Sequence, residues 1–232
     1  MIDIIIALLI GLAPIVVWLG FVLWRDIKKP EPIKWLLAAF GTGLLITPFV
    51  LILENLYVIF WNKLAGVFSL GDWGILLGAA TIEEIIKWFA VYLLLKKNTH
   101  FDEAIDAMIY LIILALGFAT VENIIVSYQG LLSGTMAANL QVLGLRFIGA
   151  NLLHLLCSGF IGFFWAKSLI KKNKKILLLG LILGISLHTI FNMIIMKLGS
   201  EFLLIGSGIL FIFAMIVLWA FDVLEPIRFK TK

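Results

Sequence analysis

The sequence predicts an all-α protein, a polytopic bundle of about seven transmembrane helices that forms one domain over residues 1–232. Two observations predict this fold class. Apolar residues make up 63% of the chain and charged residues only 14%, whereas soluble domains have roughly 45–50% and about 25%. Apolar runs of about 20 residues also recur along the chain, which is the length that a helix needs to cross a hydrocarbon core of roughly 30 Å. No polar stretch is long enough to fold independently.

Seven apolar runs account for most of the chain. The first lacks the basic start and the small-residue cleavage site of a signal peptide, so we expect it to be kept as a helix. The second is long enough to tilt in the bilayer, the third and fourth contain acidic residues, and the last three follow one another closely. We therefore expect spans at about residues 3–24, 35–60, 74–95, 105–127, 147–167, 176–197 and 202–222.

The basic residues collect in alternate loops, and the short cytoplasmic loops of membrane proteins carry such an excess of Lys and Arg. Only Lys63, Arg146 and Lys197 lie in the opposite loops, and Lys87 lies inside a span. This bias predicts an outside N-terminus and a cytoplasmic C-terminus. We expect a multi-pass protein of the cell membrane that is embedded in the lipid bilayer and does not bind nucleic acid. The other 14 of the 18 basic residues are Arg25, Lys28, Lys29, Lys34, Lys96, Lys97, Lys167, Lys171, Lys172, Lys174, Lys175, Arg228, Lys230 and Lys232.

Two adjacent glutamates, Glu83 and Glu84, lie in the middle of the third span. Ionisable groups at membrane depth cost a few kcal/mol each and are usually functional. Lys87 follows at i+4 from Glu83 and i+3 from Glu84, so it can pair with either carboxylate. We expect one glutamate to face a reaction centre as a general base, while the other pairs with Lys87. A purely structural ion pair is the alternative.

Three later spans carry further polar residues that lie at a similar depth. The fourth span has Glu122 and Asn123, the fifth has Asn151 and His154, and the sixth has His188 and Asn192. Counted from the predicted outer ends, Glu83, Glu122, His154 and His188 are roughly 5–10 residues in, or on the order of 7–15 Å. We therefore expect one site in the outer leaflet. Taken singly, the histidines and asparagines are also typical of packed helix–helix contacts, and for Glu54 in the second span we favour a structural role.

Four motifs in this order resemble the PrsW family of intramembrane proteases and, more distantly, the CAAX prenyl protease superfamily. They are Glu83-Glu84-Ile85-Ile86-Lys87, Phe118-xxx-Glu122-Asn123, His154, and His188-xxx-Asn192. The resemblance covers about residues 78–195, and we expect the catalytic core at about 74–197.

The resemblance implies an endopeptidase that cuts a membrane-bound protein substrate near the outer leaflet, such as an anti-sigma factor. It implies catalytic roles for Glu83, Glu84, Glu122, His154, His188 and Asn192, and supporting roles for Lys87, Asn123, Asn151 and Phe118. Two mechanisms fit these residues. A glutamate protease would need no cofactor. A metalloprotease would hold zinc or another divalent metal, and the candidate ligands are Glu83, Glu122, His154 and His188, with Glu84 as the other carboxylate available from the pair.

Other chemistries and other functions can also be compared with the sequence. There is no H-E-x-x-H motif that would identify zinc directly. Cys157 lies at i+3 from His154, but no other feature supports a cysteine nucleophile. A proton- or cation-coupled transporter would use the same buried Glu and His residues as an ion relay, although no pair of broken spans recurs as inverted repeats would require. A catalytically silent membrane scaffold is the third possibility.

Overall fold

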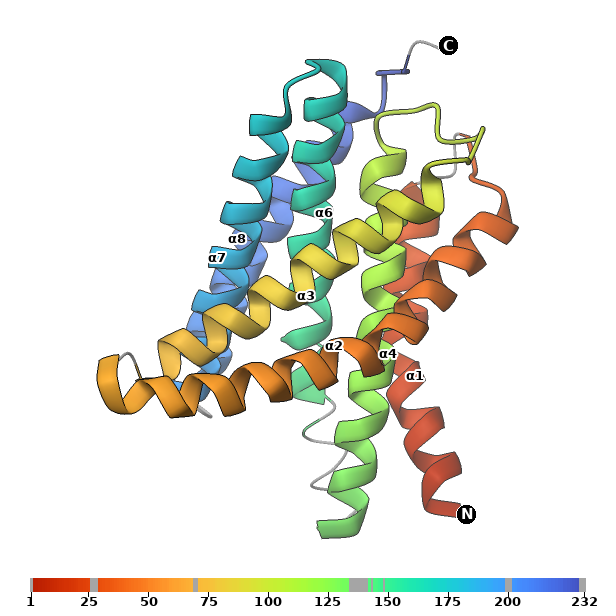
Figure 1. The fold of residues 1–232 in the computed structure, drawn as a ribbon. Coiled ribbons are helices and arrows are strands. Elements are labelled where there is room, and N and C mark those ends of the chain that lie inside the picture. The colour runs from red at the N-terminus through yellow and green to blue at the C-terminus, as the bar shows by residue number, and fades with distance from the viewer. Residues whose placement is uncertain are drawn as a thin grey trace.

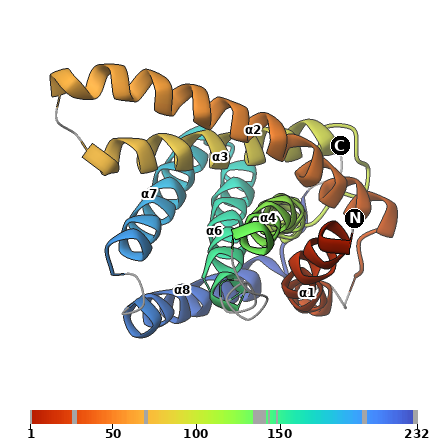
Figure 2. The same cartoon turned by 90° about the horizontal axis from the view of Figure 1, so that it is seen from below.

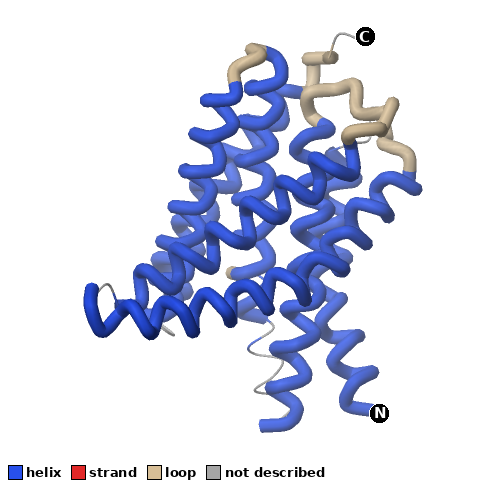
Figure 3. The backbone as a smooth tube through the Cα atoms, viewed as in Figure 1, coloured by secondary structure: helices blue, strands red, loops and turns tan. Residues whose placement is uncertain are grey.

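The predicted helical fold is confirmed by the computed structural model, which describes residues 2–25, 29–68, 71–133, 142, 144–147, 149–198 and 202–229. Across these residues the chain forms long helices joined by short loops (Figure 1 and Figure 3), and one isolated bridge between Glu103 and Arg228 is the only β-type pairing among them. The helices are α1 (Ile2–Arg25), α2 (Ile33–Phe68), α3 (Gly71–Leu95), α4 (Asp106–Ser133), α6 (Ala150–Ile170), α7 (Lys174–Leu198) and α8 (Phe202–Leu224).

Each predicted span coincides with one of these helices, but two helices continue well past the predicted ends. α2 ends at Phe68 rather than near residue 60, and α4 ends at Ser133 rather than near residue 127. Within the described chain, five segments are long and apolar enough to cross a membrane: Ile33–Leu64, Asp106–Leu132, Gly144–Ile170, Lys174–Lys197 and Gly206–Leu224. α3, which carries Glu83, Glu84 and Lys87, is not among them. The count of seven spans and the orientation of the termini stay predictions.

α4 lies at the centre of the bundle, and α1, α2 and α6 pack around it (Figure 2). Every residue from Glu103 to Thr120 is buried. Asp106 begins the helix, and its carboxylate accepts hydrogen bonds from the backbone N–H groups of Asp102 (3.0 Å) and Glu103 (2.8 Å). A carboxylate at this position is also favoured by the helix dipole. The start of the central helix is therefore fixed, and Glu122 lies in its second half.

α2 and α3 form an antiparallel hairpin that lies across one face of the bundle (Figure 1). α2 packs against α4, while α3 reaches across to α7. α2 changes direction midway, and Pro48 lies inside it. Proline removes one backbone hydrogen bond and clashes with the preceding turn, so a bend is expected there. The hairpin places the glutamate pair of α3 against the helices that carry the other predicted site residues.

The end of the bundle that holds the C-terminus also holds the loops that follow α3 and α6 (Figure 1). The N–H of Phe229 donates to the carbonyl of Asp102 (2.7 Å), and that of Ala104 donates to the carbonyl of Ile227 (2.9 Å). The Nζ of Lys29 donates to both carboxylate oxygens of Asp102 (2.7 and 2.9 Å), and this hydrogen bond raises the pKa of Lys29. Three segments distant in sequence are thus joined at the end where the sequence concentrates its basic residues.

α2 and α4 cross at a pair of glycines. A Cβ atom added to Gly43 would lie 2.1 Å from the carbonyl oxygen of Leu114, and one added to Gly117 would lie 2.1 Å from the carbonyl oxygen of Phe40. Both obstacles are backbone atoms, which cannot rotate away. Small residues that allow such close backbone approach are typical of helix packing in membranes. The crossing matters for the site because Phe118 and Glu122 follow directly on α4.

We expect Gly43→Ala to destabilise the protein by about 1–3 kcal/mol, the usual cost of overpacking a close contact. Gly41→Ala is the matched control, because a Cβ at Gly41 on the same helix meets no atom within 4 Å. That control should be neutral or slightly stabilising, since alanine is the better helix former. Thermal unfolding in detergent measures both variants. Equal unfolding midpoints for the two variants would contradict the close crossing.

Candidate active site

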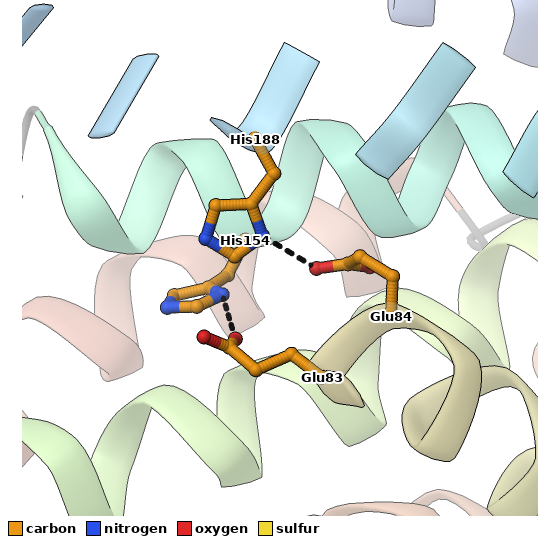
Figure 4. Close-up of side chains that lie close together, drawn as sticks. All are labelled: Glu83, Glu84, His154 and His188. Atoms are coloured by element: carbon orange, nitrogen blue, oxygen red, sulfur yellow. Dashed lines mark hydrogen bonds and ion pairs between the residues drawn. The ribbon is translucent and has the colours of Figure 1, made fainter. Parts of the chain in front are cut away.

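Four helices bring the predicted acidic and histidine residues together in the interior of the bundle. Glu83 and Glu84 come from α3, Glu122 from α4, His154 from α6 and His188 from α7. Figure 4 shows the two glutamates of α3 facing the two imidazoles, with His154 beside Glu83 and His188 beside Glu84. Glu83, Glu84, His154 and His188 are all buried. The convergence that the sequence predicts is therefore present.

Lys87 lies at the centre of this group and is fully buried. Its Nζ is 2.8 Å from Glu83 Oε2, 2.9 Å from Glu84 Oε1 and 2.9 Å from His154 Nδ1. The ammonium also lies 4.3 Å from the centre of the Phe118 ring, within range of a cation–π contact. The sequence predicts that only one glutamate pairs with Lys87, whereas the structure shows that both do. The helical offsets i+3 and i+4 allow both contacts at once.

Each histidine is paired with a different carboxylate. His188 Nδ1 is 2.9 Å from Glu84 Oε1, and His154 Nε2 is 3.0 Å from Glu122 Oε2. Since a lysine ammonium can only donate, His154 Nδ1 accepts from Lys87, and its Nε2 therefore carries the proton and donates to Glu122. The two imidazoles meet edge to face with their centres 5.3 Å apart. Carboxylates that hold one nitrogen of a histidine fix its tautomer and ring orientation.

The donors at this point fit a divalent metal. Glu83, Glu84, His154 and His188 can each offer one ligand atom, and these atoms all lie within 4.8 Å of one another. Glu84 Oε2 is buried and has no hydrogen-bond partner among the described residues, so the site holds an unsatisfied acceptor of the kind that a cation would occupy. Carboxylate and imidazole are usual zinc ligands. Glu122, which the sequence places in the metal set, lies outside this group of four and contacts the far nitrogen of His154.

The predicted supporting residues surround the site in different ways. The amide of Asn123 donates through Nδ2 to Asn151 Oδ1 at 3.0 Å, which links α4 to α6. Phe118 packs against His154 with ring centres 5.6 Å apart. Asn192 lies one turn beyond His188 on α7 and is half-buried, and the hydrogen bonds described above do not include it.

Two residues that the sequence analysis did not place in the site also contact it. Arg146 donates from Nη2 to Glu122 Oε2 (2.9 Å) and from Nε to Asn123 Oδ1 (2.7 Å). Glu54 of α2 lies close enough to Glu83 for the two carboxyl groups to interact. The sequence predicts a place in the outer loops for Arg146 and a structural role for Glu54. The sequence feature that could have indicated a role in the site is an unusual position for a charged residue. Arg146 is one of only three basic residues assigned to the outer side, and Glu54 is a carboxylate inside an apolar run.

Carboxylates and imidazoles gathered inside a bundle of membrane-length helices are an arrangement suited to an intramembrane protease. Residues 31–221 match the family model described as PrsW family intramembrane metalloprotease. The chain belongs to this family and is a membrane peptidase. The predicted family is therefore confirmed, and the match is longer than the stretch of residues 78–195 that carries the motifs. It includes the whole of α2 and most of α8, while α1 lies outside it.

Several curated relatives cover most of the chain. The Protease PrsW of Geobacillus kaustophilus is 29% identical over 189 residues, which cover 80% of this chain and 78% of the relative. The Protease PrsW of Clostridioides difficile is 29% identical over 192 residues, covering 81% and 78%. That of Bacillus subtilis is 27% identical over 194 residues, covering 82% and 83%. No solved structure matches the chain.

Proposed function

We propose that this protein is an endopeptidase of the cell membrane that cleaves a membrane-bound protein near the outer leaflet. The observation that carries the proposal is the convergence of Glu83, Glu84, His154 and His188 inside the bundle, with ligand atoms within 4.8 Å of one another. The resemblance to PrsW proteases supports an anti-sigma factor as the class of substrate. The cut would lie on the side that the sequence predicts to be outside.

Glu83 is the general base in this proposal. Glu84 is held by His188, and Glu122 is held by His154 and Arg146. Glu83 does not hold a histidine in this way, because its Oε2 is 3.7 Å from His154 Nδ1. Lys87 Nζ is closer to each of these two atoms, at 2.8 Å from Glu83 Oε2 and 2.9 Å from His154 Nδ1. A carboxylate that is not committed to orienting a histidine is available to take a proton from water. Glu84 and Glu122 then act through the imidazoles that they orient.

The reaction on these residues is a hydrolysis by an activated water. Glu83 takes one proton from the water while the oxygen attacks the carbonyl carbon of the scissile peptide. The tetrahedral oxyanion is stabilised by donors from the same cluster, for which His188 and Asn192 on α7 are the candidates. The carbon–nitrogen bond then breaks, and Glu83 returns its proton to the leaving amine.

In the metal-dependent form of the proposal, Glu83 would be a metal ligand instead of the general base, together with His154 through Nδ1 and His188 through Nε2. These are the carboxylate and the nitrogens that remain once Glu122 is paired with His154 and Glu84 with His188. Two histidines and one glutamate are a ligand set of catalytic zinc sites in peptidases. When bound, a divalent metal lowers the pKa of its water to about 7 and polarises the substrate carbonyl. Glu84 and Glu122 keep the same orienting roles with or without the metal.

The test uses the full chain reconstituted in liposomes with a single-span model substrate that carries a tag on each side of the membrane. The expected result is a cleaved product whose new terminus maps to the outer end of the span, with no proton or cation flux in the same vesicles. A flux that depends on Glu83, without any cleaved product, would favour the transporter instead. The silent scaffold would be favoured if the vesicles show no cleavage and no flux with any substrate in a panel that includes unrelated transmembrane segments and that of an anti-sigma factor.

A further inference from the structure

We infer that the Lys87 ammonium competes with a divalent metal for the same donor atoms, so that the chain carries its own counter-ion for the site when no metal is bound. This inference rests on the metal-dependent form of the proposed function. Lys87 Nζ lies 2.8 Å from Glu83 Oε2, 2.9 Å from Glu84 Oε1 and 2.9 Å from His154 Nδ1. The same three residues, with His188, form the group whose ligand atoms could hold a metal. Glu83 and His154 Nδ1 are also proposed metal ligands, and they are the donors for which the two cations compete.

The hydrogen bonds of Lys87 are complete in this arrangement. An ammonium group has three N–H donors and no acceptor, and Lys87 has three acceptors around it. Its remaining side faces the ring of Phe118, and the residue has no exposed surface. The ammonium is therefore held from every side, as a bound metal ion would be. No donor of Lys87 is left over for a second partner.

His154 shows why the two cations exclude each other. Its Nε2 is committed to Glu122, so Nδ1 is the nitrogen with a lone pair for a metal. That lone pair already accepts the Lys87 N–H. One lone pair cannot accept an N–H hydrogen bond and bind a metal at the same time. Two cations that share neighbouring donor atoms also repel each other strongly in a water-poor interior. Metal binding through His154 therefore requires the ammonium to leave.

Part of the donor set lies outside the reach of Lys87. In the part of the chain that the structure describes, Glu84 Oε2 is buried without a hydrogen-bond partner, and the contact between His188 and Glu84 is made through Nδ1. These atoms would be open to a divalent metal while Lys87 keeps its own contacts. Without metal, the positive charge of Lys87 compensates the negative charges of Glu83 and Glu84. A buried carboxylate needs such a partner, because an unpaired buried charge is strongly destabilising. The free energy of metal binding to the wild-type protein is therefore the free energy gained from the metal–ligand contacts minus the free energy needed to displace Lys87.

The test is zinc binding by the purified full chain in detergent, measured by competition with a chromophoric chelator. Removing a positive charge from the donors should make Lys87→Met bind zinc at least about tenfold more tightly than wild type. Lys87→Arg, which keeps the charge, should not show this gain. Lys63→Met is the matched control, because Lys63 is exposed on α2. Adding Glu83→Gln to Lys87→Met should remove the gain, which places the zinc at this site.

Equal or weaker zinc binding by a folded Lys87→Met variant would overturn the inference, whether or not the wild-type protein cleaves a substrate. Failure of the proposed function is a separate result, namely no cleavage by wild type. If Lys87→Met does not fold, the competition is measured on wild type labelled with ¹⁵N-lysine. Saturating zinc should then shift the Nζ resonance of the solvent-protected lysine, and an unshifted resonance with zinc bound at Glu83 would overturn the inference.

Discussion

Replacing Glu83 by glutamine is expected to lower the rate of cleavage of a membrane-tethered substrate by about 10²–10⁴-fold, the contribution of a general base. Glutamine keeps the size of the side chain and loses the group that takes the proton. Glu84→Gln should have a smaller effect of about 10–100-fold, as expected for a carboxylate that orients a histidine. Single-turnover rates in liposomes measure the chemical step directly. The difference between the two neighbours follows from the hydrogen bond of Glu84 to His188.

Asp72→Asn is the matched control for these variants, because Asp72 is an exposed carboxylate on the same helix. It should cleave at the wild-type rate. A larger loss for Glu84→Gln than for Glu83→Gln would reverse the roles proposed for the two residues. Cleavage at the wild-type rate by both variants would remove the glutamate pair from the reaction altogether.

Removing the imidazole of His154 is expected to have the second large effect, because this ring contacts Lys87, Glu122 and Phe118 at once. His154→Ala should lower the cleavage rate by about 10²–10⁴-fold, because it removes a proposed metal ligand and leaves both Lys87 and Glu122 without their contact to the ring. Glu122→Gln leaves the ring in place and loosens its orientation, so its loss should be about 10–100-fold. The same single-turnover assay ranks the two variants.

His100→Ala serves as the control for the histidine series, since His100 is exposed in the loop between α3 and α4 and is the one histidine of the sequence outside the site. Size-exclusion chromatography and circular dichroism show whether each variant keeps its fold. A Glu122→Gln variant that loses more activity than His154→Ala would mean that Glu122 acts on the substrate or the metal itself, as the sequence-based ligand set implies.

The helices could be predicted because membrane-length apolar runs leave few alternatives. Their ends were harder to predict, and α2 shows why. Its helix continues to Phe68 through Asn62 and Lys63, where the apolar run has already ended. Backbone hydrogen bonding continues through polar residues that reach water at the membrane surface. The apolar pattern therefore marks the part of a helix that is in lipid, and says less about where the helix stops.

The meeting of Glu83, Glu122, His154 and His188 could be predicted from their similar depths. Their pairing could not, because it depends on how each helix is rotated about its own axis. α4 has no polar face that would fix this rotation, since it is buried on all sides from Asp106 to Thr120. The contact of Arg146 with Glu122 was missed for a related reason. The sequence places Arg146 just before the predicted fifth span, so its depth could not be counted, whereas the structure includes it in the membrane-length segment Gly144–Ile170.

The hydrogen bonds that join Phe229 to Asp102 and Ala104 to Ile227 have a practical consequence for handling the protein. They make the C-terminal segment part of the support for the start of α4, the helix around which the others pack. A topology reporter or purification tag should therefore be fused beyond Phe229 through a flexible linker. A truncation before Ile227 would leave two backbone partners at the base of the central helix unpaired, and it would be a poor choice for crystallisation.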